Sequence, residues 1–219
     1  MPTAIIAGAS GLTGSALMEL LLENNAYDRV KILVRRPLEI DHPSLEQIVY
    51  DYEHPDNSFI RADHVYCCLG TTMKKAGSRD AFFRVDHDYP LQIARAAHQN
   101  GAGKFALMSA VGANPRSVFF YNRVKGQVEE ELKEIPFEAI YLFRPSMLLG
   151  KRKESRFGEA LGKAIMKPLS FLLPGNMKPI HVRQVAACML DKMRGEEKGI
   201  HIVQSKEMGK YPLNQRRKD

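Results

Sequence analysis

Residues 1–14 read Met-Pro-Thr-Ala-Ile-Ile-Ala-Gly8-Ala-Ser-Gly11-Leu-Thr-Gly14, and this stretch decides the fold. Residues 3–7 predict a short strand that runs into a Gly-x-x-Gly-x-x-Gly turn, and the apolar periodicity of residues 12–25 predicts a helix. A strand, a glycine-rich turn and a helix in this order are the context of a dinucleotide-binding loop. The glycines allow the tight turn, the approach of backbone amides to a pyrophosphate and close helix packing. The pyrophosphate would lie at the helix N-terminus. We therefore predict cofactor contacts at Gly8, Ser10, Gly11, Leu12, Thr13 and Gly14.

The length and composition are those of one soluble globular domain. The chain has 219 residues, 44% hydrophobic and 26% charged, which is enough for a full core but not for a second large substrate domain. The first residues lack the pattern of a secretory signal, and no run approaches the ~20 apolar residues of a transmembrane span. We expect a single cytoplasmic domain over residues 1–219.

Cysteines and charge narrow the possible partners. Cys67, Cys68 and Cys188 form neither a disulfide framework nor a Cys-x-x-Cys pair, and we expect no metal site. No nucleic-acid-binding motif accompanies the positive charge, so we expect a polyanionic cofactor and no nucleic-acid partner. The oligomeric state stays open. The net charge of +7 is concentrated at residues 35–36, 74–75, 151–156 and 216–218.

Strands and helices alternate along the rest of the chain. Short apolar runs predict strands, and longer periodic segments predict helices. This order predicts an α/β fold with a doubly wound, mostly parallel sheet of the Rossmann type. Residues 147–199 would contribute a small substrate-side part, and the polar residues 206–219 a disordered tail. For residues 160–166, core packing, a lid and a dimer face remain open. The further predicted strands are 29–34, 45–52, 63–69, 104–109, 137–143 and 200–203, and the further helices are 89–100, 121–133, 158–173 and 182–193.

Two guanidinium groups follow the second predicted strand. An NAD site usually has an acid there, about 20 residues after the glycines, to bond the ribose 2′-hydroxyl. This chain has Arg35 and Arg36 instead, and guanidinium groups hold a 2′-phosphate through charge-assisted hydrogen bonds. At roughly 1.5–3 kcal/mol per bond, two such bonds favour NADPH over NADH by a factor of order 10²–10⁴. A solvated basic pair is the alternative.

Three more strand ends supply predicted cofactor contacts. Strand three ends at Asp51 and Tyr52, where an acid can bond the adenine amino group, although an exposed loop carboxylate fits equally. After strand four, a glycine lets the cofactor ribose approach the backbone and threonine hydroxyls can bond the ribose or diphosphate. After strand six, the backbone can contact the nicotinamide carboxamide. The residues in these two segments are Leu69, Gly70, Thr71, Thr72, Arg144, Pro145 and Ser146.

Tyr121 and Lys125 lie four residues apart on a predicted helix, which places both side chains on one face. A free tyrosine has a pKa near 10, and the adjacent ammonium group together with oxidised nicotinamide favours the phenolate. We therefore predict a lowered pKa for Tyr121 as a general acid and base, with Lys125 also bonding the nicotinamide ribose. Ser109, at the end of strand five, would bond a substrate carbonyl or the Tyr121 hydroxyl. Ser117 is a second candidate, and His181 is expected to be structural.

Taken together, the sequence resembles an atypical short-chain dehydrogenase/reductase of the Tat-interacting-protein type, which binds NADPH. The glycine spacing is typical of the superfamily's extended-type loop. The resemblance implies a Rossmann domain that binds NADPH, uses Ser109, Tyr121 and Lys125, and covers its substrate side with a small C-terminal part. Ala110 replaces a second serine of the family, and residues 86–88 occupy a region where the superfamily often has asparagine. The matching segments are 8–14, 34–36, 67–72, 75–77, 83–89, 121–126 and 143–145.

Two functions remain open. The first is an NADPH-dependent oxidoreductase in which Tyr121 protonates a small-molecule carbonyl, Lys125 tunes Tyr121 and Ser109 orients the substrate. The second is a redox-silent NADPH-binding regulator that acts through a protein partner, which Ala110 favours. A nucleotide-sugar epimerase is disfavoured, because such enzymes usually carry a larger substrate domain and retain NAD. The sequence does not identify the substrate.

Overall fold

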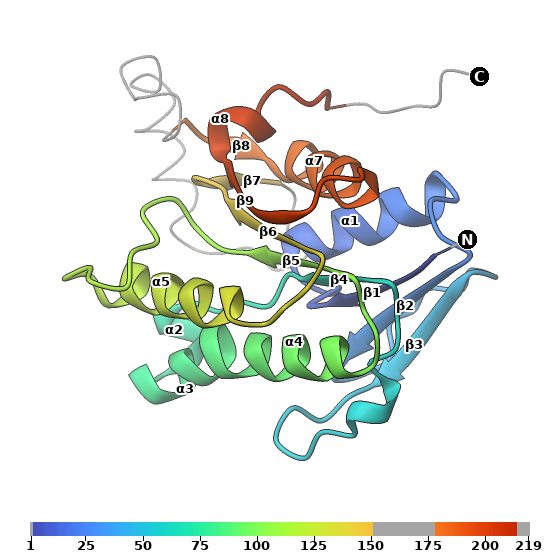
Figure 1. Ribbon diagram of the computed structural model, residues 1–219, viewed down its shortest axis with the longest axis horizontal. Coiled ribbons are helices and arrows are strands. Elements are labelled where there is room, and N and C mark those ends of the chain that lie inside the picture. The colour runs from blue at the N-terminus through green and yellow to red at the C-terminus, as the bar shows by residue number, and fades with distance from the viewer. Residues whose placement is uncertain (1, 151–177, 214–219) are drawn as a thin grey trace.

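A sheet of seven parallel strands organises the molecule, which the computed structural model describes over residues 2–150 and 178–213. Its spatial order is β3-β2-β1-β4-β5-β6-β9 (Figure 1), and the pairings are parallel. The predicted doubly wound α/β fold is confirmed. The strands are β1 (Thr3–Ala7), β2 (Arg29–Val34), β3 (Leu45–Val49), β4 (His64–Cys67), β5 (Lys104–Met108), β6 (Ala139–Arg144) and β9 (Gly199–Gln204).

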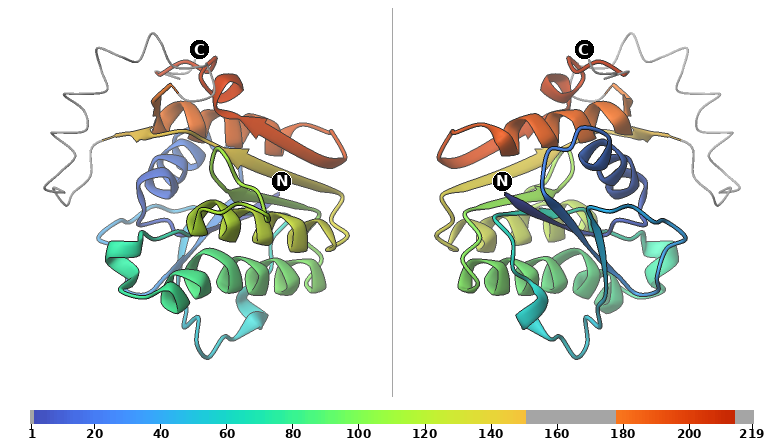
Figure 2. Two further views of the ribbon diagram at one scale, coloured as in Figure 1. Left: turned by 90° about the vertical axis from the view of Figure 1, so that its left-hand side faces the viewer. Right: turned by 90° about the vertical axis from the view of Figure 1, so that its right-hand side faces the viewer.

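Helices cover both faces of this sheet. Successive residues of a strand point to opposite faces, so Ile6 packs on the side of α1 and α7, whereas Ile5 packs on the side of α4 and α5. Figure 2 shows the resulting three layers. All strand positions of β1 after Thr3 are buried, as expected of a parallel sheet enclosed on both sides. The four helices are α1 (Leu12–Glu23), α4 (Tyr89–Gln99), α5 (Phe120–Lys133) and α7 (Val182–Arg194).

Short elements connect this framework. A π-helical turn over Arg84–Asp88 joins α3 directly to α4, and the sequence pattern did not predict it. His181 caps α7, where its ring accepts a hydrogen bond from the Arg183 amide, in line with its expected structural role. The other short elements are a 3₁₀ turn (Asn57–Phe59), α2 (Met73–Ala76), α3 (Arg79–Phe83), β7 (Leu148–Leu149), β8 (Ile180–His181) and α8 (Ser205–Met208).

The C-terminal region corrects one prediction. Residues 206–213 are ordered, whereas the polar composition predicts disorder. Met208 is fully buried, the Tyr211 hydroxyl donates to Asp191, and the Gln184 amide donates to the Gly209 and Tyr211 carbonyls. These contacts hold the segment on α7. Residues 214–219 and the helix predicted at 158–173 lie outside the described residues.

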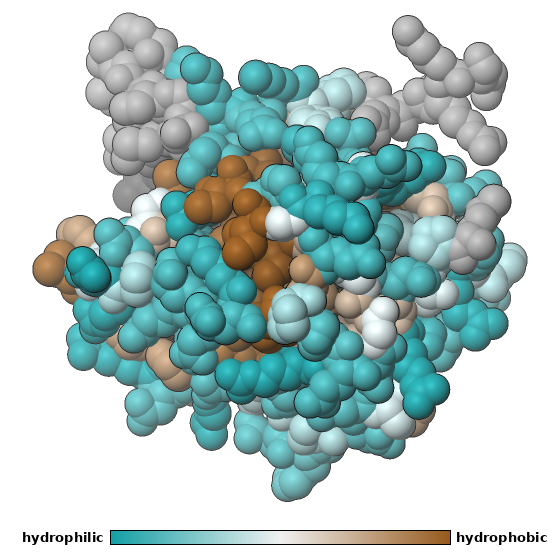
Figure 3. Space-filling view, viewed as in Figure 1, coloured by the Kyte–Doolittle hydropathy of each residue, from teal (hydrophilic) through white to brown (hydrophobic). Residues whose placement is uncertain are grey.

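The strand β9 forms one edge of the sheet and is only partly covered. Val203 is buried on the α7 side, but Ile200 and Ile202 are 49% and 43% exposed. Figure 3 shows apolar surface in this region, over β6 and β9. The candidate site is expected near the middle of the sheet, because the chain order reverses between the neighbouring strands β1 and β4. Ligands of doubly wound sheets bind at the carboxyl ends of the strands at such a switch point.

Candidate cofactor-binding and active site

The glycine loop lies at this switch point, directly after β1. Gly8 has a φ of +83°, and a Cβ there would lie 2.7 Å from the Cys68 carbonyl oxygen of the loop after β4. A Cβ on Gly14 would lie 2.2 Å from the Gly8 carbonyl oxygen. Gly11 is the N-cap residue of α1 and offers no side-chain cap, and it is exposed together with Ser10. The loop therefore presents an uncapped helix N-terminus to solvent, which suits a diphosphate. Thr13 is buried, and Leu12 packs against the core.

Gly14 supports a direct prediction. Replacement of Gly14 by alanine forces the loop away from α1, because the new methyl group would overlap backbone that cannot rotate aside. We expect NADPH affinity to fall at least ~10-fold, equal to about 1.4 kcal/mol. Fluorescence titration with NADPH measures this loss. Gly103→Ala is the matched control, since its Cβ would meet Glu138 at an ordinary 3.6 Å. Equal affinities in the two variants would contradict the prediction.

The predicted adenosine side has an exposed basic pair. Arg35 and Arg36 are both exposed just beyond β2, so their guanidinium groups are available to a ligand. Asp51 is also exposed and accepts a hydrogen bond from the Glu53 amide, which lowers the pKa of its carboxyl. Tyr52 packs between the rings of Tyr50 and Tyr89. These four predicted positions thus lie near the ends of adjacent strands β2 and β3.

The loop after β4 is tied to other elements. The Thr71 amide donates to Asp86 Oδ2 at 2.8 Å. Thr72 is the N-cap residue of α2, and its hydroxyl accepts a hydrogen bond from the Lys75 amide at 3.3 Å. A Cβ on Gly70 would lie 3.4 Å from Asp86 Oδ1. Gly70 itself is exposed and Leu69 is half-buried, so this backbone remains open to a cofactor ribose on one side.

Tyr121 and Lys125 emerge from the first two turns of α5. Lys125 is 3% exposed; its Nζ lies 2.9 Å from Asp86 Oδ1 and donates to the Met108 carbonyl at 3.2 Å. Tyr121 is 41% exposed and packs on the Phe82 ring. Burial raises the pKa of Tyr121; the charge of Lys125 opposes this rise and that of Asp86 adds to it. The protein's own groups thus raise the pKa of Tyr121, and its predicted lowering, which also depends on oxidised nicotinamide, stays a prediction.

Ser109 lies differently from the prediction. It is 4% exposed, and its hydroxyl donates to Glu129 rather than to Tyr121. Glu129 is fully buried and also binds Arg144, whose Nε donates at 3.0 Å and whose Nη2 forms an ion pair. This pairing raises the pKa of Arg144. Ser109, Glu129 and Arg144 thus form a closed polar cluster that links β5, α5 and β6.

This cluster gives a stability prediction. Glu129→Ala leaves the guanidinium of Arg144, 19% exposed, without its partner. Breaking a buried ion pair costs about 3–5 kcal/mol. For a chain of this size that is a fall in Tm of about 6–20 °C, measured by calorimetry or circular dichroism. Glu130→Ala removes the adjacent acid, which is 54% exposed, and is expected to shift Tm far less. Similar shifts for both variants would show that the cluster contributes nothing special.

The polar groups of the segment after β6 are largely engaged in hydrogen bonds within the protein. The Pro145 carbonyl accepts from the Val111 amide at 3.0 Å. The Ser146 amide donates to Ser205 Oγ at 3.2 Å, and the Ser146 hydroxyl donates to the Lys178 carbonyl. The Pro145 carbonyl and the Ser146 amide, which belong to the backbone expected to contact the nicotinamide carboxamide, are therefore engaged within the protein. In the described part of the chain, no group of three or more His, Cys, Asp or Glu is arranged to hold a metal ion.

The sequence patterns did not predict two residues of this site, Glu129 and Asp86. Glu129 lies eight residues after Tyr121, and the i, i+4, i+8 spacing of Tyr121, Lys125 and Glu129 on one helix face was a usable signal. Asp86 belongs to the Val-Asp-x-Asp-Tyr run that carried the family resemblance. Its contact with Lys125 joins positions 39 residues apart, which no local pattern reveals.

Residues 8–149 match the family model described as NAD(P)H-binding. The chain belongs to this NAD(P)H-binding family. Protein HTATIP2 of Rattus norvegicus is 42% identical over 164 residues, which cover 72% of this chain and 67% of the rat protein. The mitochondrial protein FMP52 of Eremothecium gossypii is 31% identical over 216 residues, which cover 94% of this chain and 95% of the relative. The predicted resemblance is confirmed at the level of an NAD(P)H-binding protein homologous to HTATIP2 and FMP52.

Solved structures extend the comparison to the fold. The UDP-N-acetylglucosamine 4-epimerase of Methanobrevibacter ruminantium superposes with a TM-score of 0.71 at 18% identity, covering 93% of this chain and 76% of the epimerase. The UDP-glucose 4-epimerase of Thermus thermophilus gives 0.69 at 16% identity, covering 94% and 80%. This NAD(P)H-binding chain therefore shares its fold with larger enzymes.

The comparisons also correct the expected location. The cytoplasmic prediction is contradicted, because the fungal relatives are named as mitochondrial proteins. Composition and the pattern of the first residues carried too little information about location to decide it. None of the helices in the described ranges has the length and apolar character needed to cross a membrane.

Proposed function

We propose that this protein is an NADPH-dependent reductase of carbonyl compounds and that Tyr121 supplies the proton. The observation that carries the proposal is the placement of Tyr121 and a buried Lys125 on α5, with Lys125 bound through Asp86 to the loop after β4. The glycine loop fits a dinucleotide, since side chains at Gly8 and Gly14 would fill the close backbone approaches that shape it. Bound NADPH would supply a hydride to the carbonyl carbon.

The residues of α5 suit the acid role. Because burial raises the pKa of Tyr121, its phenol stays protonated at neutral pH and can donate a proton to the carbonyl oxygen. The ammonium group of Lys125 would stabilise the phenolate that forms. Since the acid must be protonated, reduction is expected to fall only as pH rises through the pKa of Tyr121, which lies above the ordinary value of about 10. The Ser109 hydroxyl donates to Glu129 and would in this way help to position α5. To orient a substrate carbonyl, this hydroxyl would have to leave Glu129 and turn toward the substrate.

The first experiment is a side-by-side titration of the cofactor-stripped protein with NADPH and NADH. Tight NADPH binding with NADH at least roughly tenfold weaker supports the basic-pair assignment and justifies a screen of aldehydes and ketones with NADPH. Failure to bind either nucleotide would overturn the reductase proposal.

A second candidate function is a redox-silent NADPH-binding regulator acting through a protein partner. The engagement of Ser109 by Glu129 favours it, as does Ala110 at the position of the family's second serine. Turnover distinguishes the two candidate functions. A regulator binds NADPH but does not oxidise it with any carbonyl compound tested.

A further inference from the structure

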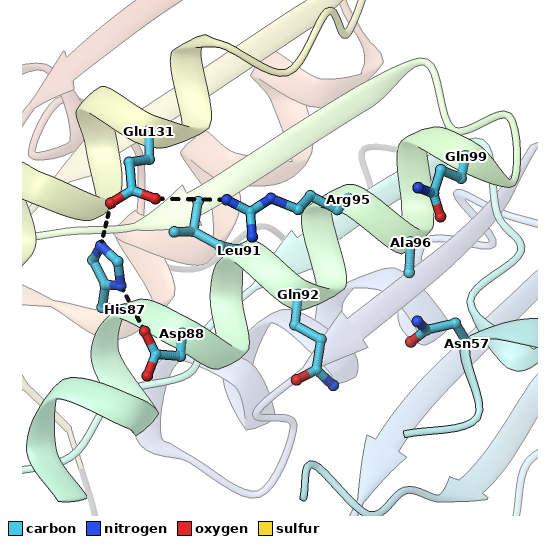
Figure 4. A pocket seen from close by; sticks show the side chains of 9 residues that line it. All are labelled: Asn57, His87, Asp88, Leu91, Gln92, Arg95, Ala96, Gln99 and Glu131. Carbon is cyan, nitrogen blue, oxygen red and sulfur yellow. Dashed lines mark hydrogen bonds and ion pairs between the residues drawn. The ribbon is translucent and has the colours of Figure 1, made fainter. Parts of the chain in front are cut away.

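The π-helical turn Arg84–Asp88 holds α5 at two points. Asp86 pairs with Lys125, and the ring of the next residue, His87, lies 2.9 Å from Oε1 of Glu131, six residues further along α5. Figure 4 shows His87 between Asp88 and Glu131, with Arg95 on the other oxygen of Glu131. Single π-helical turns of this kind occur frequently at functional sites. Here the turn directs two successive side chains onto one helix.

Asp86 also reaches the predicted cofactor loop. Its Oδ2 accepts from the Thr71 amide at 2.8 Å, while its Oδ1 lies 2.9 Å from Lys125 Nζ. The residue is 1% exposed, so both interactions are shielded from solvent. One carboxylate therefore joins the backbone after β4 to the lysine of α5.

The chemistry of these contacts requires a carboxylate. The Thr71 amide and the Lys125 ammonium are both donors, and an ionised carboxylate offers only acceptors. An asparagine in the same place would have to turn its NH₂ group toward one of the two donors. Burial also disfavours the charged form of a lysine, and the groups that favour it here are Asp86 first, with Tyr121 and Cys67.

We propose that Asp86 is a positioning residue that keeps Lys125 charged and couples it to the Gly70–Thr71 backbone, so that the cofactor loop and α5 act as one unit. This inference rests on the proposed function, since it assigns Lys125 and the loop to the same site. The role is specific to Asp86. Asp88, two residues later on the same turn, has a side chain that is 47% exposed and bonds His87.

The test compares Asp86→Asn with Asp88→Asn as the matched control. Lysine labelled with ¹³C at Cε reports the titration of Lys125 by NMR, with Lys125→Met assigning the signal. We expect Lys125 to titrate above its ordinary value in the wild type and in Asp88→Asn, and below it in Asp86→Asn. We also expect the Kd for NADPH to rise at least ~10-fold only in Asp86→Asn.

Unchanged Lys125 titration in a folded Asp86→Asn variant would overturn the inference. If this variant does not fold, the wild-type titration decides alone, because a wild-type Lys125 that titrates below its ordinary value contradicts the role given to Asp86. None of these readouts depends on turnover. If the protein binds NADPH but reduces no carbonyl compound, the proposed function is wrong. The role of Asp86 is still tested by the titration of Lys125 and by the Kd for NADPH.

Discussion

Replacing Tyr121 with phenylalanine is expected to lower the rate of carbonyl reduction by about 10²–10⁴-fold, the usual contribution of a positioned general acid. The ring of Tyr121 packs on Phe82, and phenylalanine keeps this packing while it removes only the hydroxyl. We therefore expect the Kd for NADPH and the Tm to change little. Single-turnover oxidation of bound NADPH, followed at 340 nm with a substrate from the carbonyl screen, measures the effect.

Tyr211→Phe is the control for this variant. Its hydroxyl bonds Asp191 on α7, away from the cofactor loops, so its removal should leave the rate of reduction near the wild-type value. If Tyr121→Phe retains the wild-type rate, Tyr121 is not the proton donor. The regulator candidate predicts no turnover in either variant or in the wild type.

The double replacement of Arg35 and Arg36 by alanine is expected to abolish the preference for NADPH. Two charge-assisted bonds to the 2′-phosphate correspond to a factor of order 10²–10⁴, and both side chains are exposed at the end of β2 where a ligand can reach them. The Kd for NADPH should rise by this factor, whereas the Kd for NADH, which lacks the phosphate, should stay the same. Titration with both nucleotides gives the ratio, and the single variants assign it between the two arginines.

Arg29→Ala controls for the loss of positive charge, because Arg29 begins the same strand and pairs with Glu46 on the surface. It should leave both affinities unchanged. A double variant that still prefers NADPH would show that Arg35 and Arg36 are only a solvated basic pair.

Local sequence patterns were enough for the framework of this protein. The strand-turn-helix order of residues 3–23 follows from short-range periodicity and from glycines whose close backbone contacts exclude a side chain. Buried parallel strands read as apolar runs, so their positions could be predicted, although β3 ends at Val49 rather than at residue 52. The spacing of Tyr121 and Lys125 likewise depends only on the helical repeat.

Tertiary structure decided which polar groups meet. The sequence contained Ser109, Glu129 and Arg144, but only the packing of β5, α5 and β6 shows that they satisfy one another and that the serine is occupied. Asp86 meets Lys125 where the π-helical turn packs against α5. The fold also decides the direction of the Tyr121 pKa shift. Burial and the charge of Asp86 raise this pKa and outweigh the lowering by the ammonium group of Lys125. Desolvation and charge pairing depend on distances through space, and these are set by the fold rather than by the spacing of residues along the chain.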